Sequence, residues 1–374
     1  MFLNLAVLFQ VFLFISYLLC AIHEDSYTEL QQELIPPKEN ETKINYYAEM
    51  IHRALIESDL DVVVDVVIAT NVSERLAIAW AYYNRYAKSL DIELENKIEN
   101  TDLGNLMAGM FVSRAVFLAK DLRSAITGLG TDEDTLSEIM CCLNASERKE
   151  LRETYRVYFD TDLVKDIEED TSGHYETLLL HLTIVARDDR ESDIKSFKLK
   201  VADAVTKLTS ETQKIPTVSP WPTSKSPLHE VIFVNFQPIV DVFSSNSFFV
   251  IWKASIKFKI ITGNELKETI RRSTSGDFQD LLLDILQFSE YDLIFHARKI
   301  HAGLTEYWYQ PNRKPLTRAL VMLSKVELAR LQDIYWDING REITEALYEN
   351  LRDPYNSAVT RILNSNDDWE LSFR

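Results

Sequence analysis

The chain has 374 residues, of which 46% are apolar and 26% are charged, so it has ample material for a large buried core. Its 58 acidic residues outnumber its 40 basic residues, which gives a formal net charge of −18 at pH 7. A surface of this sign repels nucleic acid, which we exclude as a partner, and it also repels anionic lipid unless a cation bridges the two.

The first predicted element is an apolar run over residues 2–22 that contains no charge. It resembles a secretory signal with a small-residue exit near Cys20 and Ala21, although the basic residues that usually begin a signal are missing. The run is also long enough for a membrane anchor, and a mis-assigned start or a buried segment is a third reading. We expect a signal peptide or anchor over 1–21, an N-terminal segment over 22–42, and a secreted or extracellular, membrane-associated protein; the alternative location is the cytoplasmic face of membranes.

Two short loops near the middle of the chain concentrate glycine. Residues 127–132 read Thr-Gly-Leu-Gly-Thr-Asp, residues 170–173 read Asp-Thr-Ser-Gly, and together they hold three of the nine glycines. Glycine allows positive φ and the close approach of backbone carbonyl groups. Thr131 to Asp134 then supply an N-cap and acidic residues to a helix whose apolar positions follow a helical spacing. These positions are Leu136, Ile139, Met140 and Leu143.

Backbone carbonyls and one carboxylate are the ligands of a hard cation such as Ca²⁺, which takes six to eight oxygens. The candidate metal ligands are the carbonyl groups of Ile126, Gly128 and Gly130 and the carboxylate of Asp170. The loop lacks the alternating acidic residues and closing glutamate of an EF-hand. The same residues are also compatible with a helix-capping turn, in which Asp170 is the N-cap of a helix that begins near Tyr175.

Residues 120–190 resemble one repeat of the annexin family. The segments that carry the resemblance are Ala125 to Asp132, Asp162 to Val164, Asp170 to Gly173 and Ala186 to Asp188. The resemblance implies an all-α fold of four annexin-type repeats, each of about five helices, that form a curved disc. It also implies calcium-dependent binding to anionic phospholipid membrane surfaces, with Ca²⁺ as the ligand.

The second loop recurs along the chain with spacings of about 69, 103 and 77 residues, which fits four repeats with one insertion. Four prolines between Pro216 and Pro227 predict that the insertion is a linker over residues 195–229. The expected domains are repeat 1 over 43–113, repeat 2 over 114–190, a linker with the start of repeat 3 over 191–230, repeat 3 over 231–290, repeat 4 over 291–367 and a tail over 368–374.

Three of the four repeats depart from the calcium motif. Alignment of Gly104 with Gly173 places Thr101 at the carboxylate position of repeat 1, and the equivalent positions of repeats 3 and 4 fall on Ser273 and Asn350. The first loops of repeats 1 and 4 lack the glycine pair, and that of repeat 3 falls in the insertion around Trp221. We therefore expect one competent site, in repeat 2, with weak calcium affinity of about 10⁻⁴ to 10⁻³ M.

Periodic apolar residues predict helices on both sides of the insertion. They include Tyr175, Leu178, Leu179 and Leu182 before it and Leu281, Leu282, Ile285 and Leu286 after it. Residues 231–261 are rich in Val, Ile and Phe, so propensity alone favours strand. Because residues 260–276 resemble the end of an annexin repeat, we expect 231–261 to be helical.

The remaining motifs give little sign of catalysis. Cys141 and Cys142 are adjacent on a predicted helix, where their side chains should diverge by about 100°, so we expect buried thiols rather than a disulfide. No phosphate-binding glycine loop, His-Glu-x-x-His motif, Cys-x-x-Cys pair or nucleophile elbow is present, and we expect no enzyme. The basic segments 195–200 and 252–259 could contact phosphate or sulfated glycan, or be solvated helix faces.

Two functions from different classes follow. The first is calcium-dependent phospholipid binding through the site of repeat 2. The alternative is a secreted or structural annexin-like scaffold that binds a protein or glycan partner largely without calcium, through the insertion and the basic segments.

Overall fold

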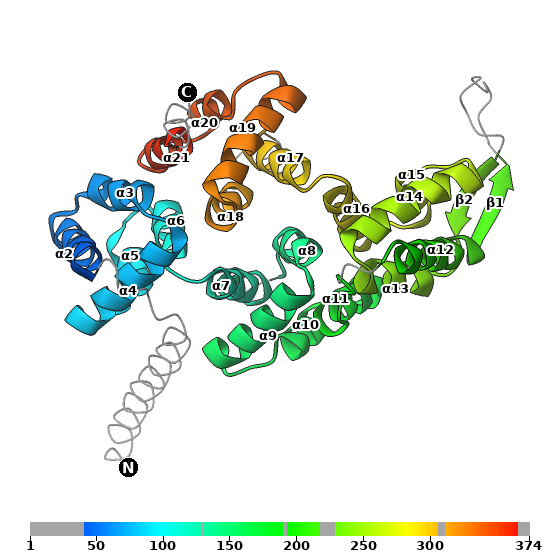
Figure 1. Ribbon diagram of the computed structural model, residues 1–374, viewed down its shortest axis with the longest axis horizontal. Helices are drawn as coiled ribbons and strands as arrows, with labels where there is room; N and C mark the ends of the chain where they lie inside the picture. Colours follow the sequence, from blue (N-terminus) through cyan, green and yellow to red (C-terminus); the bar gives the residue numbers. More distant parts are fainter. Residues whose placement is uncertain (1–40, 129, 190–192, 217–228, 306–310, 366–374) are drawn as a thin grey trace, which may run out of the picture. The chain divides into compact units, whose positions relative to one another are not determined.

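The computed structural model describes residues 41–128, 130–189, 193–216, 229–305 and 311–365 (Figure 1). Within these residues the chain forms twenty α-helices and one two-stranded β-hairpin. None of the helices described there is long and apolar enough to cross a membrane. The expected signal peptide or anchor over 1–21, the tail over 368–374 and the segment around Trp221 lie outside the described residues.

The helices follow one another in four sets of five, which we call repeats 1 to 4. Repeat 1 contains α2 (Glu41–Glu57), α3 (Leu60–Ala69), α4 (Val72–Tyr86), α5 (Leu90–Lys97) and α6 (Thr101–Met110). Repeat 2 contains α7 (Arg114–Ile126), α8 (Glu133–Cys142), α9 (Ala145–Phe159), α10 (Leu163–Asp170) and α11 (Gly173–Ile184). Repeat 3 contains α12 (Ile194–Ser210), α13 (Gln237–Ser245), α14 (Phe248–Thr262), α15 (Leu266–Ser273) and α16 (Gly276–Glu290). Repeat 4 contains α17 (Asp292–Thr305), α18 (Lys314–Met322), α19 (Lys325–Asn339), α20 (Ile343–Asn350) and α21 (Tyr355–Asn364).

The repetition extends to helix length and to helix ends. The third helix of every repeat has 15 residues and the fourth has 8. The third helices of repeats 1 and 4 begin with a capping box, formed by Asn71 with Glu74 and by Ser324 with Glu327. The all-α fold of four five-helix repeats is therefore confirmed, with a hairpin added to it.

The predicted apolar stripes form the cores of the repeats. The predicted positions from Tyr175 to Leu182 are buried in α11, and those from Leu281 to Leu286 are buried in α16. Their three- and four-residue spacing places them on one side of each helix, so burial follows the sequence pattern directly.

The described helices separate into two compact units. Unit 1 comprises the described residues within 1–117, 153–161 and 300–374, and it contains repeat 1 with most of repeat 4. Within it, Arg361 Nη1 of α21 lies 2.6 Å from Asp61 Oδ1 of α3, and the same guanidinium also pairs with Asp65. Arg313 Nη1 lies 2.5 Å from Asp102 Oδ2 of α6. Residues more than 200 positions apart in the sequence thus hold this unit together.

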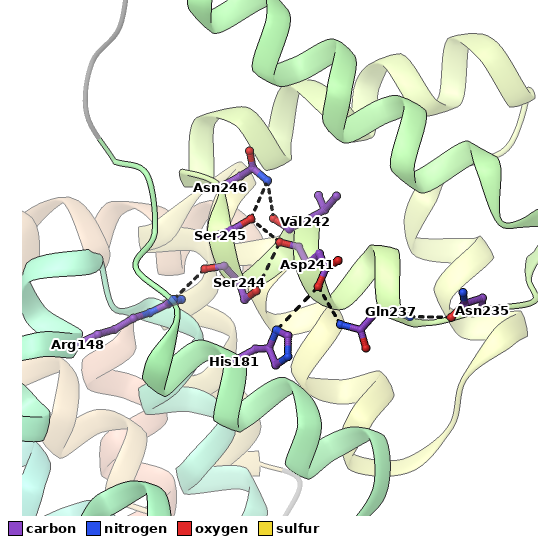
Figure 2. A network of polar contacts seen from close by, with 9 residues as sticks. All are labelled: Arg148, His181, Asn235, Gln237, Asp241, Val242, Ser244, Ser245 and Asn246. Atoms are coloured by element: carbon purple, nitrogen blue, oxygen red, sulfur yellow. Dashed lines mark hydrogen bonds and ion pairs between the residues drawn. The ribbon is translucent and has the colours of Figure 1, made fainter.

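Unit 2 comprises residues 118–152 and 162–299 and contains most of repeat 2 with repeat 3. Here the end of α13 is capped by groups from repeat 2. Arg148 Nη1 donates to the Ser244 carbonyl over 3.0 Å, as Figure 2 shows. Arg187 Nη2 donates to the Phe243 carbonyl over 3.3 Å, and the Asp188 N–H donates to the Ser245 carbonyl over 2.8 Å. Three carbonyls that no helical N–H can satisfy are thereby bonded.

The hairpin lies between α12 and α13. Strand β1 (Thr212–Pro216) pairs antiparallel with β2 (His229–Phe233), so that Thr212 faces Phe233 and Pro216 faces His229. The prediction of helix over 231–261 is wrong for 231–233 and correct for α13 and α14. Val231 and Phe233 are buried while Ile232 between them is partly exposed, and this alternation with period two is what a strand requires.

The insertion is shorter than predicted. Residues 194–210, which fall almost entirely within the linker expected over 195–229, form helix α12. Val201, Ala204, Val205 and Leu208 are buried along one side of this helix. This three- and four-residue spacing is a helical core pattern, and the prolines that suggested a linker begin only at Pro216.

Candidate metal site

The first predicted loop joins α7 to α8. Gly128 has φ of 142° and Gly130 has φ of 91°, values that residues with a Cβ rarely adopt. No atom lies within 4 Å of the position that a Cβ would take at either glycine, so conformation rather than space requires glycine here. Asp132 closes the loop as the N-cap of α8, because its carboxylate accepts from the Thr135 N–H over 3.0 Å.

The second predicted loop joins α10 to α11. Asp170 is the last residue of α10, and Thr171 and Ser172 connect it to Gly173 at the start of α11. The Thr171 N–H donates to the Ile167 carbonyl over 3.0 Å, which ends α10 in a regular turn. Asp170 is therefore not the N-cap of the following helix, and the alternative that gave it only that role is wrong.

Thr131 brings the two loops together. Its Oγ1 donates to Asp170 Oδ2 over 2.6 Å and lies 3.1 Å from the Asp170 carbonyl oxygen. A second link lies one turn earlier on α10, where Arg123 Nη1 approaches Asp166 Oδ2 to 2.5 Å. Sequence reasoning named Asp170 but missed Thr131, although its place directly after the glycine pair was the available signal.

The residues present suit a hard cation. Gly128 and Gly130 are exposed, Ile126 is buried and Asp170 is half-buried, so a cation held here would have protein on one side and solvent on the other. In the described ranges, no three His, Cys, Asp or Glu side chains gather as a metal-binding group. The predicted ligands, three backbone carbonyls and the Asp170 carboxylate, are oxygen ligands that calcium accepts.

The same position can now be compared in all four repeats. Each fourth helix has eight residues and is followed by an N–H that bonds to the carbonyl four residues before it. The last residues of these helices are Lys97, Asp170, Ser273 and Asn350. Ser273 and Asn350 were predicted, but Thr101 was wrong for repeat 1. Thr101 begins α6, and Gly104, which served for the alignment, is buried inside that helix.

In repeat 3 the hairpin occupies the place of the first loop. The Phe233 N–H at the end of β2 donates to Ser273 Oγ over 2.8 Å, as Thr131 does to Asp170 in repeat 2. Ser273 Oγ in turn donates to the Thr269 carbonyl over 2.6 Å. The hydroxyl is thus used to attach the hairpin to α15, and the last residue of α15 carries no carboxylate.

The loops of repeats 1 and 4 differ in another way. Only two residues, Ser58 and Asp59, connect α2 to α3, so the glycine loop has no counterpart there. In repeat 4, Asn350 Nδ2 donates back to the Ala346 carbonyl over 2.9 Å. The first loop of repeat 4 includes residues 306–310, which lie outside the described ranges.

The cysteine pair departs from expectation. Cys141 Sγ and Cys142 Sγ lie 3.4 Å apart, and both are free thiols. The prediction that the side chains diverge is wrong, because rotation about χ1 brings the sulfurs together even when the Cα–Cβ bonds point apart. Burial raises the pKa of both thiols, so neither is an activated nucleophile.

The chain is similar to known annexins. The protein-family model Annexin matches residues 117–182, which include both loops. Annexin A5 of Cynops pyrrhogaster is 25% identical over 333 residues, which cover 86% of this chain and 93% of the relative.

Solved structures share the fold along most of the chain. Annexin III has a TM-score of 0.73 at 22% identity, over 88% of this chain and 95% of its own. A calcium-bound annexin (Sm)1 has a TM-score of 0.69 at 22% identity, over 86% of this chain and 90% of its own. The matched repeat and the relative that aligns along nearly its whole length make this chain similar to annexins, and the solved structures show that it has the annexin fold.

Proposed function

We propose that this protein binds anionic phospholipid membranes in a calcium-dependent manner through the loops of repeat 2. The proposal is carried by the 2.6 Å hydrogen bond from Thr131 to Asp170, because it holds the glycine loop against the carboxylate. In the proposed site, Ca²⁺ binds the carbonyl oxygens of Ile126, Gly128 and Gly130 and the carboxylate of Asp170.

These four residues leave part of the calcium shell to water. Calcium takes six to eight oxygens, so a lipid phosphate can replace the remaining water and connect the protein to the bilayer through the ion. Such a bridge also offsets the repulsion between anionic lipid and a chain of net charge −18. By linkage, lipid raises the affinity for calcium by the same factor as calcium raises the affinity for lipid.

We propose further that repeat 2 holds the one competent site of this type. The last residue of the fourth helix is the positively charged Lys97 in repeat 1, and it is uncharged in repeats 3 and 4, where it is Ser273 and Asn350. A single site forgoes the avidity of several loops on one membrane. Its affinity should lie in the weak range of about 10⁻⁴ to 10⁻³ M, tightened by lipid.

The similarity to a calcium-bound annexin (Sm)1 supports Ca²⁺ as the ion. The activity that we propose is binding and not catalysis. The leader-like residues 2–22 lie outside the described ranges, so secretion stays a prediction from the sequence.

A second candidate function has its own observation in repeat 3. There, Ser273 and β2 form a structural attachment in place of a metal site. This favours an annexin-like scaffold in which the hairpin presents residues to a protein or glycan partner without calcium.

Sedimentation with phosphatidylserine vesicles across a calcium titration tests the first proposal. The full chain should bind increasingly as calcium rises toward the millimolar range. Asp170→Ala should raise the calcium concentration for half-maximal binding at least about tenfold, because it removes the one carboxylate of the shell. Glu169→Ala is the matched control, since Glu169 is exposed on the same helix and forms only a 3.5 Å surface pair with Lys165.

Equal losses in both variants would mean that general charge, not the site, controls binding. If the wild-type chain shows no calcium-dependent binding at 5 mM calcium, an upper limit of about five times the weakest expected affinity, the scaffold becomes the better proposal.

A further inference from the structure

Helices α12 and α14 carry a charge opposite to that of the whole chain. Together they contain seven lysines and one acidic residue, Asp203, although the chain has a formal charge of −18. The lysines are Lys195, Lys198, Lys200, Lys207, Lys253, Lys257 and Lys259. These helices contain the two basic segments that the sequence singled out, and the candidate metal site uses neither.

The two helices pack side by side in unit 2 (Figure 1), so the two basic segments lie on neighbouring helices. Their inner sides are buried, with Val201 and Leu208 on α12 and Ile251 and Phe258 on α14 among the contacts of the core. The lysines therefore lie on the outer sides, where α12 and α14 face solvent.

Large apolar side chains share this outer surface. Phe249 is 52% exposed and Ile260 is 76% exposed on α14, and Leu199 is 63% exposed on α12. Phe197 of α12 stacks on Phe249 with ring centroids 4.9 Å apart, and Trp252 lies 5.7 Å from Phe249. The aromatic rings thus join the exposed sides of the two helices. We call Phe197, Phe249, Trp252, Ile256 and Ile260, with the lysines around them, the basic apolar face.

Only some of these lysines are neutralised by the protein. Lys200 pairs with Asp188 at 2.6 Å and Lys207 with Asp203 at 2.9 Å, and Lys259 pairs with Glu265. The Lys253 ammonium lies 3.6 Å from the centroid of the Trp252 ring, which leaves its charge uncompensated.

Lys195, Lys198 and Lys257 are exposed, and no ion pair with a carboxylate is found for them in the described part of the chain. Four lysines of the two helices thus carry charges that no carboxylate of the described residues pairs with, and the exposed apolar side chains lie on the same helices.

We propose that the basic apolar face is a second membrane contact, which binds anionic lipid without calcium. Charge complementarity selects an anionic occupant, and the exposed isoleucines and aromatic rings select a lipid surface over a sulfated glycan, which offers nothing apolar to them. Trp and Phe side chains insert at the level of the headgroups, while lysine stems lie along apolar surface and keep their ammonium groups near phosphate. The contact needs none of the loops of repeat 2, so it goes beyond the proposed calcium-dependent function.

The test is vesicle sedimentation in the presence of a calcium chelator, with the full chain. Phosphatidylserine vesicles should bind the protein, phosphatidylcholine vesicles should not, and binding should weaken as salt rises. The double variant Lys253→Gln, Lys257→Gln should bind roughly 30-fold more weakly, because each lysine near an anionic surface raises the affinity about fivefold to sixfold. Ile260→Ser should also weaken binding.

The matched control is Lys88→Gln, Lys165→Gln, which removes the same charge from exposed lysines elsewhere and should leave binding within about threefold of wild type. Asp170→Ala should bind chelator-treated vesicles as wild type does, which separates this contact from the calcium site. Unchanged circular dichroism and unfolding midpoints would show that the face variants are folded.

Three results would overturn the proposal. The first is absence of binding to anionic vesicles without calcium, and the second is equal binding by the face variant and the control. The third is a different occupant: a dimer in sedimentation without vesicles that only the face variants abolish, or binding to heparin that the lysine variant loses and Ile260→Ser keeps.

Discussion

Backbone conformation at single residues determines whether the repeat 2 loop can place its carbonyl groups. Gly130 has φ of 91° and no neighbour that a Cβ would meet, while Gly104 lies inside α6, where a Cβ would find its nearest atoms at an ordinary 3.6 Å. Position 130 therefore requires glycine and position 104 does not, although the alignment of repeats matched Gly104 to the loop residue Gly173.

Gly130→Ala should destabilise the loop by about 1 kcal/mol and weaken calcium binding, because alanine disfavours positive φ. Gly104→Ala should instead stabilise the protein by about 0.5–1 kcal/mol, because a helix interior prefers alanine. Urea unfolding measures the stability of both variants, and vesicle sedimentation across a calcium titration measures calcium binding by Gly130→Ala. Equal stability changes in both variants would contradict the conformational argument.

The residue scale also shows what the sequence could predict about the site. Asp170, Ser273 and Asn350 were found because a threonine or serine motif follows each of the first two and the repeat spacing fixes the third. Lys97 was missed because the marker was a glycine, and α5 is joined to α6 by three residues instead of the two that follow α10. The hydrogen bond from Thr131 to Asp170 joins side chains 39 residues apart, and its one signal in the sequence was the place of Thr131 directly after the glycine pair.

At the scale of elements, the C-terminus of α13 depends on two buried arginines, Arg148, which Figure 2 shows, and Arg187. Arg148 and Arg187 are each 3% exposed, and burial lowers the pKa of Arg148 to about 10 and that of Arg187 to about 9. The Arg187 guanidinium lies 3.9 Å from the centroid of the Phe248 ring. Cations at a helix C-terminus interact favourably with its carbonyl groups, which offsets part of the cost of burying them.

Arg148→Met should lower the free energy of unfolding by about 1–3 kcal/mol, because it leaves the buried Ser244 carbonyl without its donor. Arg156→Met, an exposed arginine on the same helix α9, is the matched control and should change stability by less than about 0.5 kcal/mol. The measurement is urea denaturation followed by circular dichroism. If Arg148→Met leaves the free energy of unfolding unchanged, the cost of burying the Arg148 charge equals the stabilisation from its hydrogen bond to α13.

Two elements show where sequence patterns were sufficient and where they failed. The stripes of α11 and α16 were predicted residue by residue, because burial on one side of a helix leaves a direct pattern. The hairpin was missed because Val231 to Phe233 are followed by the apolar positions of α13 and α14, and one continuous apolar stretch hides the change of period from 2 to 3.6. Pairing with β1, a long-range contact, decides that these residues form a strand.

At the scale of the whole molecule, the fourth helices begin at Leu90, Leu163, Leu266 and Ile343, so the repeat period is 73, 103 and 77 residues. The period estimated from loop motifs agrees except at the first interval, where the glycine marker was misplaced. Unit 1 contains repeat 1 with most of repeat 4, and unit 2 contains repeat 3 with most of repeat 2. The candidate calcium site belongs entirely to unit 2.

Calcium should therefore stabilise the two units unequally. If the dissociation constant of the site is about 1 mM, 10 mM calcium should stabilise the folded site by about 1.4 kcal/mol. Amide hydrogens that exchange only when the site opens should then exchange roughly tenfold more slowly. Peptide-resolved hydrogen exchange should show this protection in α7 to α11 within unit 2, and no change in α2 to α6 of unit 1, where Lys97 stands at the equivalent position. The protection should disappear in Asp170→Ala and persist in Glu169→Ala. Protection of equal size in repeat 1 would instead reveal a second calcium site, formed without a carboxylate at the end of its fourth helix, and would refute the one-site proposal.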